Sequence, residues 1–291
     1  MPSPCNSTSG MFEAEPGVFL YYEVSGNCST HRSILLLHGF GASTEDWIDV
    51  RDQLGEEACV VSLDLKGHGR SSRPRDGDYS LDTQSDLLLT FISSHCLSNT
   101  VLIGHSYGGA VALLAVVKAQ MKGTKLPISA LVLVDVPGYP QPVPAFLRVL
   151  YMPIIGRLVS LIPSRMAMKF SLRKAFYDHR KISPAIVSRY ASAMDRPGSH
   201  YALALAAKGM LPNDLSGYLA GLGKIELPTL ILWGDHDRIV PSSVGARLKK
   251  DIAGSSLQFV QNCGHVPQEE QPDEFLALLK AFLRTVPDLT Q

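Results

Sequence analysis

The sequence predicts an α/β fold in which helices cover both faces of a mostly parallel sheet. Short apolar or β-branched runs alternate with longer segments of helical periodicity. Strands that alternate with helices favour parallel pairing through right-handed crossovers. The alternation stops between Pro137 and Glu226, where helical periodicity continues with many Pro and Gly breaks. Because a structureless loop of that length is implausible in a compact domain, residues 138–226 are predicted to form an inserted helical cap. Residues 1–137 and 227–291 then form the core domain.

The predicted strands and helices follow one another in a regular order. The expected strands begin with an edge strand at the end of a polar tail, and their ranges are Val18–Val24, Ile34–Leu37, Val60–Leu63, Val101–Ile103, Leu131–Val134, Leu230–Trp233 and Leu257–Val260. The first expected helix starts at Ser43, whose spacing to Asp46 fits a capping box, and runs through Leu54. Further helices are expected at Leu81–Ser94, Tyr107–Met121, Ser243–Ile252 and Asp273–Arg284.

Composition and charge exclude several classes of protein. The 291 residues include 27 Lys and Arg and 27 Asp and Glu, so no overall field attracts nucleic acid or an acidic membrane surface. The longest apolar stretch, Val143–Ile162, is interrupted by Arg148, Pro153 and Arg157, so no membrane-spanning segment is predicted. The sequence is that of an ordinary globular protein whose partner is a small molecule. It does not predict an oligomeric state.

The cysteines predict neither a disulfide framework nor a zinc site. They are odd in number, scattered and without C-x-x-C spacing: Cys5, Cys28, Cys59, Cys96 and Cys263. The N-terminus lacks a basic region followed by an apolar core, so no signal peptide is predicted. A reducing compartment, the cytoplasm, is therefore expected, and the glycosylation sequons at Asn6 and Asn27 are expected to be chance matches.

The most informative stretch is Gly104-His-Ser106-Tyr-Gly108, which follows an apolar strand and precedes an apolar helix. A turn sharp enough to lift a hydroxyl above the sheet crowds its neighbours, and glycines two residues before and after the serine relieve that crowding. The helix N-terminus beneath the serine favours negative charge there. Ser106 is therefore the predicted nucleophile. His105 is expected to be structural, because adjacent residues at such a turn point in different directions.

A serine nucleophile needs a base that a third group orients. His265 follows the last predicted strand, whose C-terminal end opens on the same edge of the sheet as Ser106, so it is the predicted base. Two acids follow the preceding strand. Asp235 lies in the tight turn after Gly234 and is expected to bond local N–H groups, whereas Asp237 is better placed to reach His265. Asp135, after Leu131–Val134, is a third candidate.

A further strand-end turn, His38-Gly-Phe40-Gly41, can supply the oxyanion hole. Acyl transfer needs two N–H donors that face the developing oxyanion. The expected pair is the backbone N–H of Phe40 and that of Tyr107, while His38 is expected to brace loops. The Asp64–Ser71 turn lacks a complete phosphate-binding pattern and is expected to be architectural.

Together these motifs resemble the α/β-hydrolase superfamily, in its branch of small capped esterases and lipases. The resemblance covers nearly the whole chain from Val18, and the joint order of the motifs is more specific than any one of them. It implies an eight-stranded sheet with a helical lid inserted after strand 6, a triad of Ser106, Asp237 and His265, no metal and no cofactor.

Departures from the family narrow the expected chemistry. Epoxide hydrolases and haloalkane dehalogenases of this fold have an aspartate nucleophile, and position 106 is serine. Relatives that cleave carbon–carbon bonds usually show Asn before the serine and Trp after the histidine. Hydroxynitrile lyases show Lys after the histidine. This chain has His105 before the serine and Val266 after the histidine. The predicted reaction is hydrolysis of a carboxylic ester through an acyl-enzyme. The alternatives are carbon–carbon bond hydrolysis, a slow-turnover small-molecule receptor, or an inactive scaffold.

The cap is expected to contribute to substrate binding. Its apolar residues Phe146, Leu150 and Ile155 are predicted to line a pocket for an acyl chain, although packing of the cap on the core would explain them equally well.

Overall fold

The computed structural model describes residues 8–75, 77–95, 97–152 and 162–287, and for Phe146 only the backbone. It contains an eight-stranded sheet of order β1-β2-β4-β3-β5-β6-β7-β8. The strands are β1 (Thr8–Glu15), β2 (Val18–Gly26), β3 (Ser33–Leu37), β4 (Cys59–Leu63), β5 (Thr100–His105), β6 (Ile128–Val134), β7 (Thr229–Gly234) and β8 (Ser256–Val260). The six strands from β3 to β8 are parallel, while β2 pairs antiparallel with both β1 and β4. The predicted fold class is confirmed.

One strand prediction is wrong at the edge of the sheet. The segment expected as an edge strand is the second strand, β2, because part of the supposed polar tail forms β1 outside it. The alternate residues Phe12 and Ala14 of β1 pack against the core, and the Phe12 ring meets Phe91 edge to face at 5.5 Å. Gly17, with φ +79°, closes the turn between the two strands. The glutamates of β1 face outward and conceal the alternation in the sequence.

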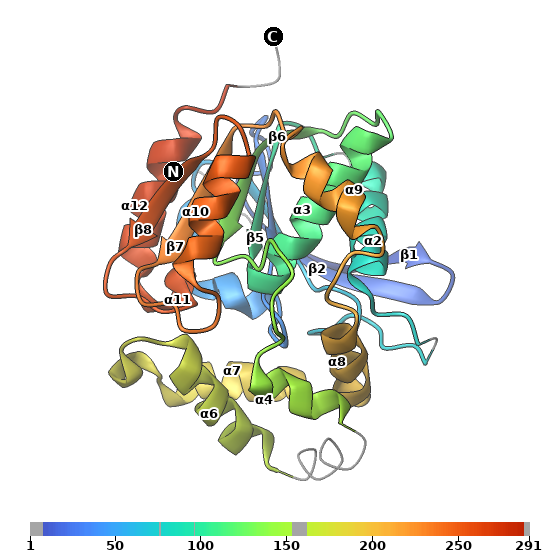
Figure 1. Ribbon diagram of the computed structural model, residues 1–291, viewed down its shortest axis with the longest axis vertical. Helices are drawn as coiled ribbons and strands as arrows, with labels where there is room; N and C mark the ends of the chain where they lie inside the picture. Colours follow the sequence, from blue (N-terminus) through green and yellow to red (C-terminus); the bar gives the residue numbers. More distant parts are fainter. Residues whose placement is uncertain (1–7, 76, 96, 153–161, 288–291) are drawn as a thin grey trace.

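Helices cover both faces of the sheet (Figure 1). One apolar cluster joins one face to α2 (Leu81–Ser94), α3 (Ser106–Met121) and α10 (Ser242–Asp251). A second cluster joins the other face to α1 (Ile48–Gly55) and α12 (Pro272–Leu283). Two short helices, η1 (Thr44–Trp47) and α11 (Pro267–Glu270), precede α1 and α12. Each predicted core helix is present, with ends within a few residues of those expected.

The described part of residues 138–226 contains helices and no strand. They are α4 (Ala145–Arg148), η2 (Val149–Tyr151), α6 (Ser164–Ala175), η3 (His179–Lys181), α7 (Pro184–Met194), α8 (Ser199–Lys208) and α9 (Leu215–Leu222). Helices α4, α6, α7 and α8 lie together below the sheet in Figure 1, whereas α9 packs beside α3. Among the described helices, none has the length and apolar character needed to cross a membrane.

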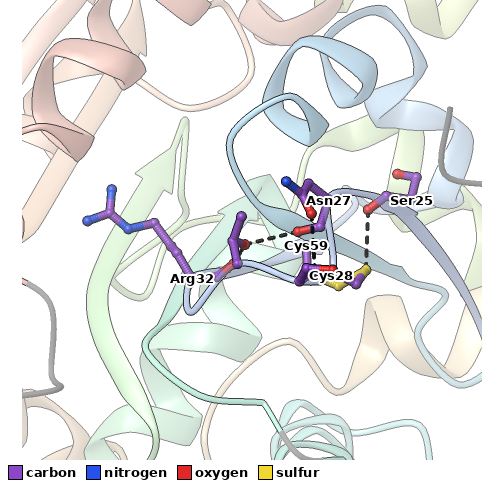
Figure 2. Close-up of a disulfide and its surroundings, with 7 residues drawn as sticks. Ser25, Asn27, Cys28, Arg32 and Cys59 are labelled. Carbon is purple, nitrogen blue, oxygen red and sulfur yellow. Dashed lines mark hydrogen bonds between the residues drawn. A yellow bond between two sulfur atoms is a disulfide. The ribbon is translucent and has the colours of Figure 1, made fainter. Parts of the chain in front are cut away.

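A disulfide joins Cys28, in the loop after β2, to Cys59 at the start of β4 (Figure 2). The expectation that the cysteines are unpaired is wrong for these two. Strand register explains the pairing: Gly26 lies opposite Cys59 in the antiparallel β2–β4 pair, and Cys28 follows two residues later. This register cannot be read from a spacing of 31 residues. Because disulfides are rare in the cytosol, the pair argues against the predicted cytoplasmic location, which stays a prediction.

Reduction of the disulfide is expected to destabilise the fold without removing the site. Freeing a loop of 31 residues costs about 3.7 kcal/mol of unfolding free energy in the chain-entropy account. The melting temperature should fall by several degrees in dithiothreitol, and a Cys28→Ser/Cys59→Ser variant should melt at the same lower temperature with or without reductant. Thermal unfolding checks this. Alkylation of both cysteines in unreduced, denatured protein would contradict the pairing.

Candidate active site

The predicted nucleophile, base and acid meet at the C-terminal ends of three parallel strands. Ser106 follows β5, Asp237 lies beyond β7 and His265 lies beyond β8. His265 Nε2 lies 2.8 Å from Ser106 Oγ, and His265 Nδ1 lies 2.7 Å from Asp237 Oδ2. The imidazole is buried, and the Asp237 side chain is fully covered. An imidazole bridging a hydroxyl and a carboxylate is the arrangement that activates a serine for nucleophilic attack.

The backbone at Ser106 adopts the sharp turn that its motif predicts. Its φ is +48°, a left-handed conformation that a residue with a side chain rarely adopts. A Cβ atom on Gly104 would lie 2.5 Å from the Gly109 backbone, and one on Gly108 would lie 2.5 Å from the His38 carbonyl oxygen. Only glycine fits at these two positions, which allows α3 to begin directly beneath the hydroxyl.

The two acids after β7 have separate partners. Asp235 Oδ1 accepts hydrogen bonds from the Cys263 N–H at 3.0 Å and pairs with His236. Asp237 Oδ2 faces His265, while its Oδ1 accepts hydrogen bonds from the N–H groups of Ile239 at 2.7 Å and Val240 at 3.1 Å. Burial opposes ionisation of Asp237, but His265 and these N–H donors outweigh it and lower its pKa. Asp237 is thus held as a carboxylate against the imidazole.

Asp135, the third candidate acid, lies behind this pair. It follows β6 with φ +50°, and its Oδ1 accepts a hydrogen bond from the Gly234 N–H at 3.0 Å. Its Oδ2 is buried without a hydrogen-bond partner among the described residues. One carboxylate oxygen of Asp135, one of Asp237 and a ring nitrogen of His265 all lie within 4.8 Å of one another. Burial, and then the negative charge of Asp237, raise the pKa of Asp135 well above its ordinary value, whereas the pKa of Asp237 is lowered.

An Asp135→Asn variant is expected to gain stability relative to the native protein as pH rises. A carboxyl with a raised folded-state pKa keeps a proton that the unfolded chain has already lost, so native stability falls with pH between the unfolded and folded pKa values. Asn does not titrate. Between the unfolded and folded pKa values, the difference in unfolding free energy between the variant and the native protein should grow by about 1.4 kcal/mol per pH unit. Urea unfolding at several pH values above 4 measures it, and a difference independent of pH would contradict the raised pKa of Asp135.

The predicted oxyanion donors lie in the turn after β3 and in the first turn of α3. The Phe40 N–H has no hydrogen-bond partner among the described residues. Tyr107 lies in the first turn of α3, where a helix leaves its N–H groups without intrahelical partners. The adjoining turn is braced as expected: His38 Nδ1 lies 2.7 Å from the Gly39 carbonyl oxygen, and His38 Nε2 accepts a hydrogen bond from the Leu65 N–H at 3.0 Å.

A buried polar network supports the site, and sequence reasoning missed most of it. His105 Nδ1 lies 2.9 Å from Asp46 Oδ2, and its Nε2 lies 2.7 Å from the His265 carbonyl oxygen. Burial alone would lower the pKa of His105, but the ion pair and hydrogen bond with Asp46 outweigh it and raise this pKa. Asp46 also accepts hydrogen bonds from the Gly39 N–H at 3.0 Å and the Tyr190 hydroxyl at 2.8 Å.

This network corrects the predicted capping box. The Ser43 side chain caps the N–H of Glu45, and Asp46 points into the protein instead of back toward Ser43. Its spacing alone could not distinguish a capping residue from a buried acid. Asp46 therefore ties the turn that carries Phe40, through His105, to the segments that carry Ser106 and His265.

The loop that carries Gly264 and His265 is also hydrogen-bonded to the end of α6. The His265 N–H donates to the Ala175 carbonyl oxygen at 2.6 Å. The carboxylate of Glu270 accepts hydrogen bonds from the Gly264 N–H at 2.7 Å and from the Asp178 N–H at 2.6 Å. It therefore joins the loop that carries His265 to the segment after α6. A Cβ on Gly264 would lie 2.1 Å from the Ala175 oxygen, which explains a glycine before the histidine.

Two largely apolar cavities border Ser106. The larger, of about 480 Å³, borders Ser106, His265 and Leu150 of η2. The smaller, of about 160 Å³, borders Ser106 and Tyr107 and extends to Tyr218. Leu150 thus lies where an acyl-chain contact was predicted, whereas the Phe146 side chain and Ile155 lie outside the described residues.

One group of described side chains has the spacing that a metal ion would need: Asp135, Asp237 and His265. Both ring nitrogens of His265 already contact Asp237 and Ser106, so the geometry suits proton transfer.

Several known proteins resemble this chain in sequence or in structure. Residues 32–272 match a family model described as the alpha/beta hydrolase fold. The chain is 28% identical to monoacylglycerol lipase abhd6-A of Xenopus laevis, over 91% of this chain and 79% of the relative. It is 26% identical to 2-hydroxymuconate semialdehyde hydrolase of a Pseudomonas strain, over 86% of each. The solved structure of 2-hydroxy-6-oxo-6-phenylhexa-2,4-dienoate hydrolase from Rhodococcus superposes with a TM-score of 0.78 at 23% identity, covering 96% and 99% of the two chains.

Proposed function

The chain belongs to the alpha/beta hydrolase fold family, and from this premise we propose that it is a serine hydrolase that cleaves carboxylic esters through an acyl-enzyme. The observation that carries the proposal is the contact of 2.8 Å between His265 Nε2 and Ser106 Oγ, with Asp237 on the other ring nitrogen. A buried, oriented base beside a serine on a strained turn has a direct use in nucleophilic catalysis.

In the proposed mechanism Ser106 Oγ attacks the ester carbonyl carbon while His265 Nε2 takes the hydroxyl proton. The Phe40 and Tyr107 N–H groups hold the tetrahedral oxyanion, and Asp237 stabilises the imidazolium. His265 then returns the proton to the leaving alcohol, and the carbon–oxygen bond of the ester breaks. His265 then takes a proton from a water molecule as the water oxygen attacks the acyl carbon. The bond between this carbon and Ser106 Oγ breaks, His265 returns the proton to Oγ, and the acid leaves. Asp237 stays ionised throughout, which its lowered pKa favours.

The shape of the site supports a substrate with two apolar arms. An ester carries an acyl and an alcohol group on either side of its reacting carbon, and the two cavities meet at Ser106. We further propose that residues 138–226 form a cap over residues 1–137 and 227–291, and that Phe146, Leu150 and Ile155 belong to the substrate-binding part of this cap. The lipase among the relatives supports an ester substrate.

Carbon–carbon bond hydrolysis on the same triad is the second candidate. The name of the Pseudomonas relative favours it. The residues that flank the motifs, His105 and Val266, favour the ester.

Active-site labelling followed by a substrate panel tests the proposal. A fluorophosphonate probe should modify the peptide that contains Ser106 in native protein and leave heat-denatured protein unlabelled. p-Nitrophenyl esters of graded acyl length should turn over faster than a ring-fission dienoate. Label on another residue would contradict the assignment of the nucleophile, and faster turnover of the dienoate would favour the second candidate.

A further inference from the structure

Charge is unevenly distributed along this formally neutral chain. Residues 138–208 contain eleven Lys and Arg, two Asp and no Glu, although the whole chain has 27 of each sign. The rest of the chain therefore has an excess of acidic residues equal to the excess of basic residues in residues 138–208. The overall balance, which predicts no field toward an acidic membrane surface, conceals a basic segment, residues 138–208, in an otherwise acidic chain.

Helix α6 carries the most concentrated part of this charge. Arg165, Lys169, Arg173 and Lys174 are all exposed, and Ser164–Ala175 contains no acidic residue. Within the described parts of the chain, none of these four side chains forms an ion pair with a carboxylate. Lys174 lies over the ring of Phe170, 5.8 Å from its centroid. The four charges are thus available to a partner outside the chain.

The same helix exposes large apolar side chains beside these charges. Met166 and Phe170 lie one helical turn apart and are each 60% exposed, and Ile162 just before the helix is 38% exposed. All three also border the larger cavity that reaches Ser106. A monomeric protein rarely leaves such side chains together in water without a use for them. Exposed Met and Phe next to Lys and Arg are typical of helices that lie in a membrane interface.

We propose that the α6 face, defined by Arg165, Met166, Lys169, Phe170 and Arg173, binds the surface of an anionic lipid membrane. Charge complementarity selects this occupant, because lysine and arginine attract acidic headgroups while Met166 and Phe170 enter the boundary between headgroups and acyl chains. The larger cavity, which Met166 and Phe170 border, then lies next to the membrane, so that an apolar molecule can pass from the lipid into the site.

Vesicle co-sedimentation of the Ser106→Ala protein tests this proposal without depending on turnover. The protein should bind vesicles of phosphatidylcholine with phosphatidylserine, bind phosphatidylcholine alone much less, and dissociate at high salt. Each Lys or Arg near the surface contributes about fivefold to partitioning, so Lys169→Glu/Arg173→Glu should reduce binding at least about 25-fold. Met166→Ser/Phe170→Ser should also reduce binding, and this reduction should persist at low salt.

Lys249→Glu/Lys250→Glu is the matched control, because it changes the net charge equally on exposed residues of α10 in the core. It should bind as the parent does, and circular dichroism should show that all variants are folded. An equal loss in this control, binding to neither kind of vesicle, or retention only on a polyanion such as heparin would overturn the proposal. A dimer in solution that the Met166→Ser/Phe170→Ser change dissociates would assign the face to self-association instead.

Discussion

A Ser106→Ala variant should lose ester hydrolysis almost completely while keeping its fold. Removal of the hydroxyl leaves His265 without a nucleophile to activate, and loss of a triad serine typically lowers kcat by about 10⁶-fold. The remaining rate, still above that in water, would come from binding and from the Phe40 and Tyr107 donors. Steady-state kinetics on a p-nitrophenyl ester measures the loss, and thermal unfolding reports the fold.

The control for this change is Ser243→Ala, an exposed serine at the start of α10. It should retain native kcat and KM. If Ser106→Ala retained even a tenth of native turnover, the reaction would not proceed through this hydroxyl, and the proposed mechanism would have to be abandoned.

An Asp237→Asn variant should lower kcat by about 10⁴-fold, because the amide no longer stabilises the imidazolium and favours the wrong tautomer of the base. KM should change little, since Asp237 lies behind His265 and borders neither cavity. Stopped-flow or steady-state kinetics separates the two parameters. The loss should be similar for short and long acyl chains.

Asp235→Asn is the matched control, two residues earlier in the same loop. Its carboxylate accepts hydrogen bonds from the Cys263 N–H and contacts His236, and neither group touches the reacting atoms. We expect a modest loss of stability and less than about a tenfold change in kcat. If Asp235→Asn caused the large loss of kcat and Asp237→Asn caused only the small change, Asp235 would be the orienting acid.

The fold was largely predictable because buried parallel strands form short, continuous apolar runs. The runs at Ile34–Leu37 and Leu131–Val134 lie inside β3 and β6, which are fully buried. The strand β1 was not predictable in the same way, since it is exposed on one face and its outward glutamates conceal the alternation. The Cys28–Cys59 pair depends on antiparallel register between β2 and β4, which the spacing of cysteines does not encode.

The central part of the site was predictable because its groups follow strands whose C-terminal ends share one edge. This reasoning placed Ser106 and His265 together and preferred Asp237 to Asp235. It could not find Asp46, which is 59 residues from His105, because a buried acid on a helical turn has the same spacing as a capping residue. The excess of basic residues in residues 138–208 is visible only in the charge of that segment, because acidic residues elsewhere cancel it in the net charge of the whole chain.

The bond from the His265 N–H to the Ala175 carbonyl oxygen has a consequence for engineering. If residues 138–226 are exchanged for the matching segment of a relative, the exchange alters a junction that holds His265, the proposed base, in place. A chimera whose donor segment changes the backbone path at residues 175–178 would misplace the imidazole even if every triad residue were retained. Exchange points outside this stretch, with Gly264 and Glu270 kept, give such a hybrid its best prospect of turnover.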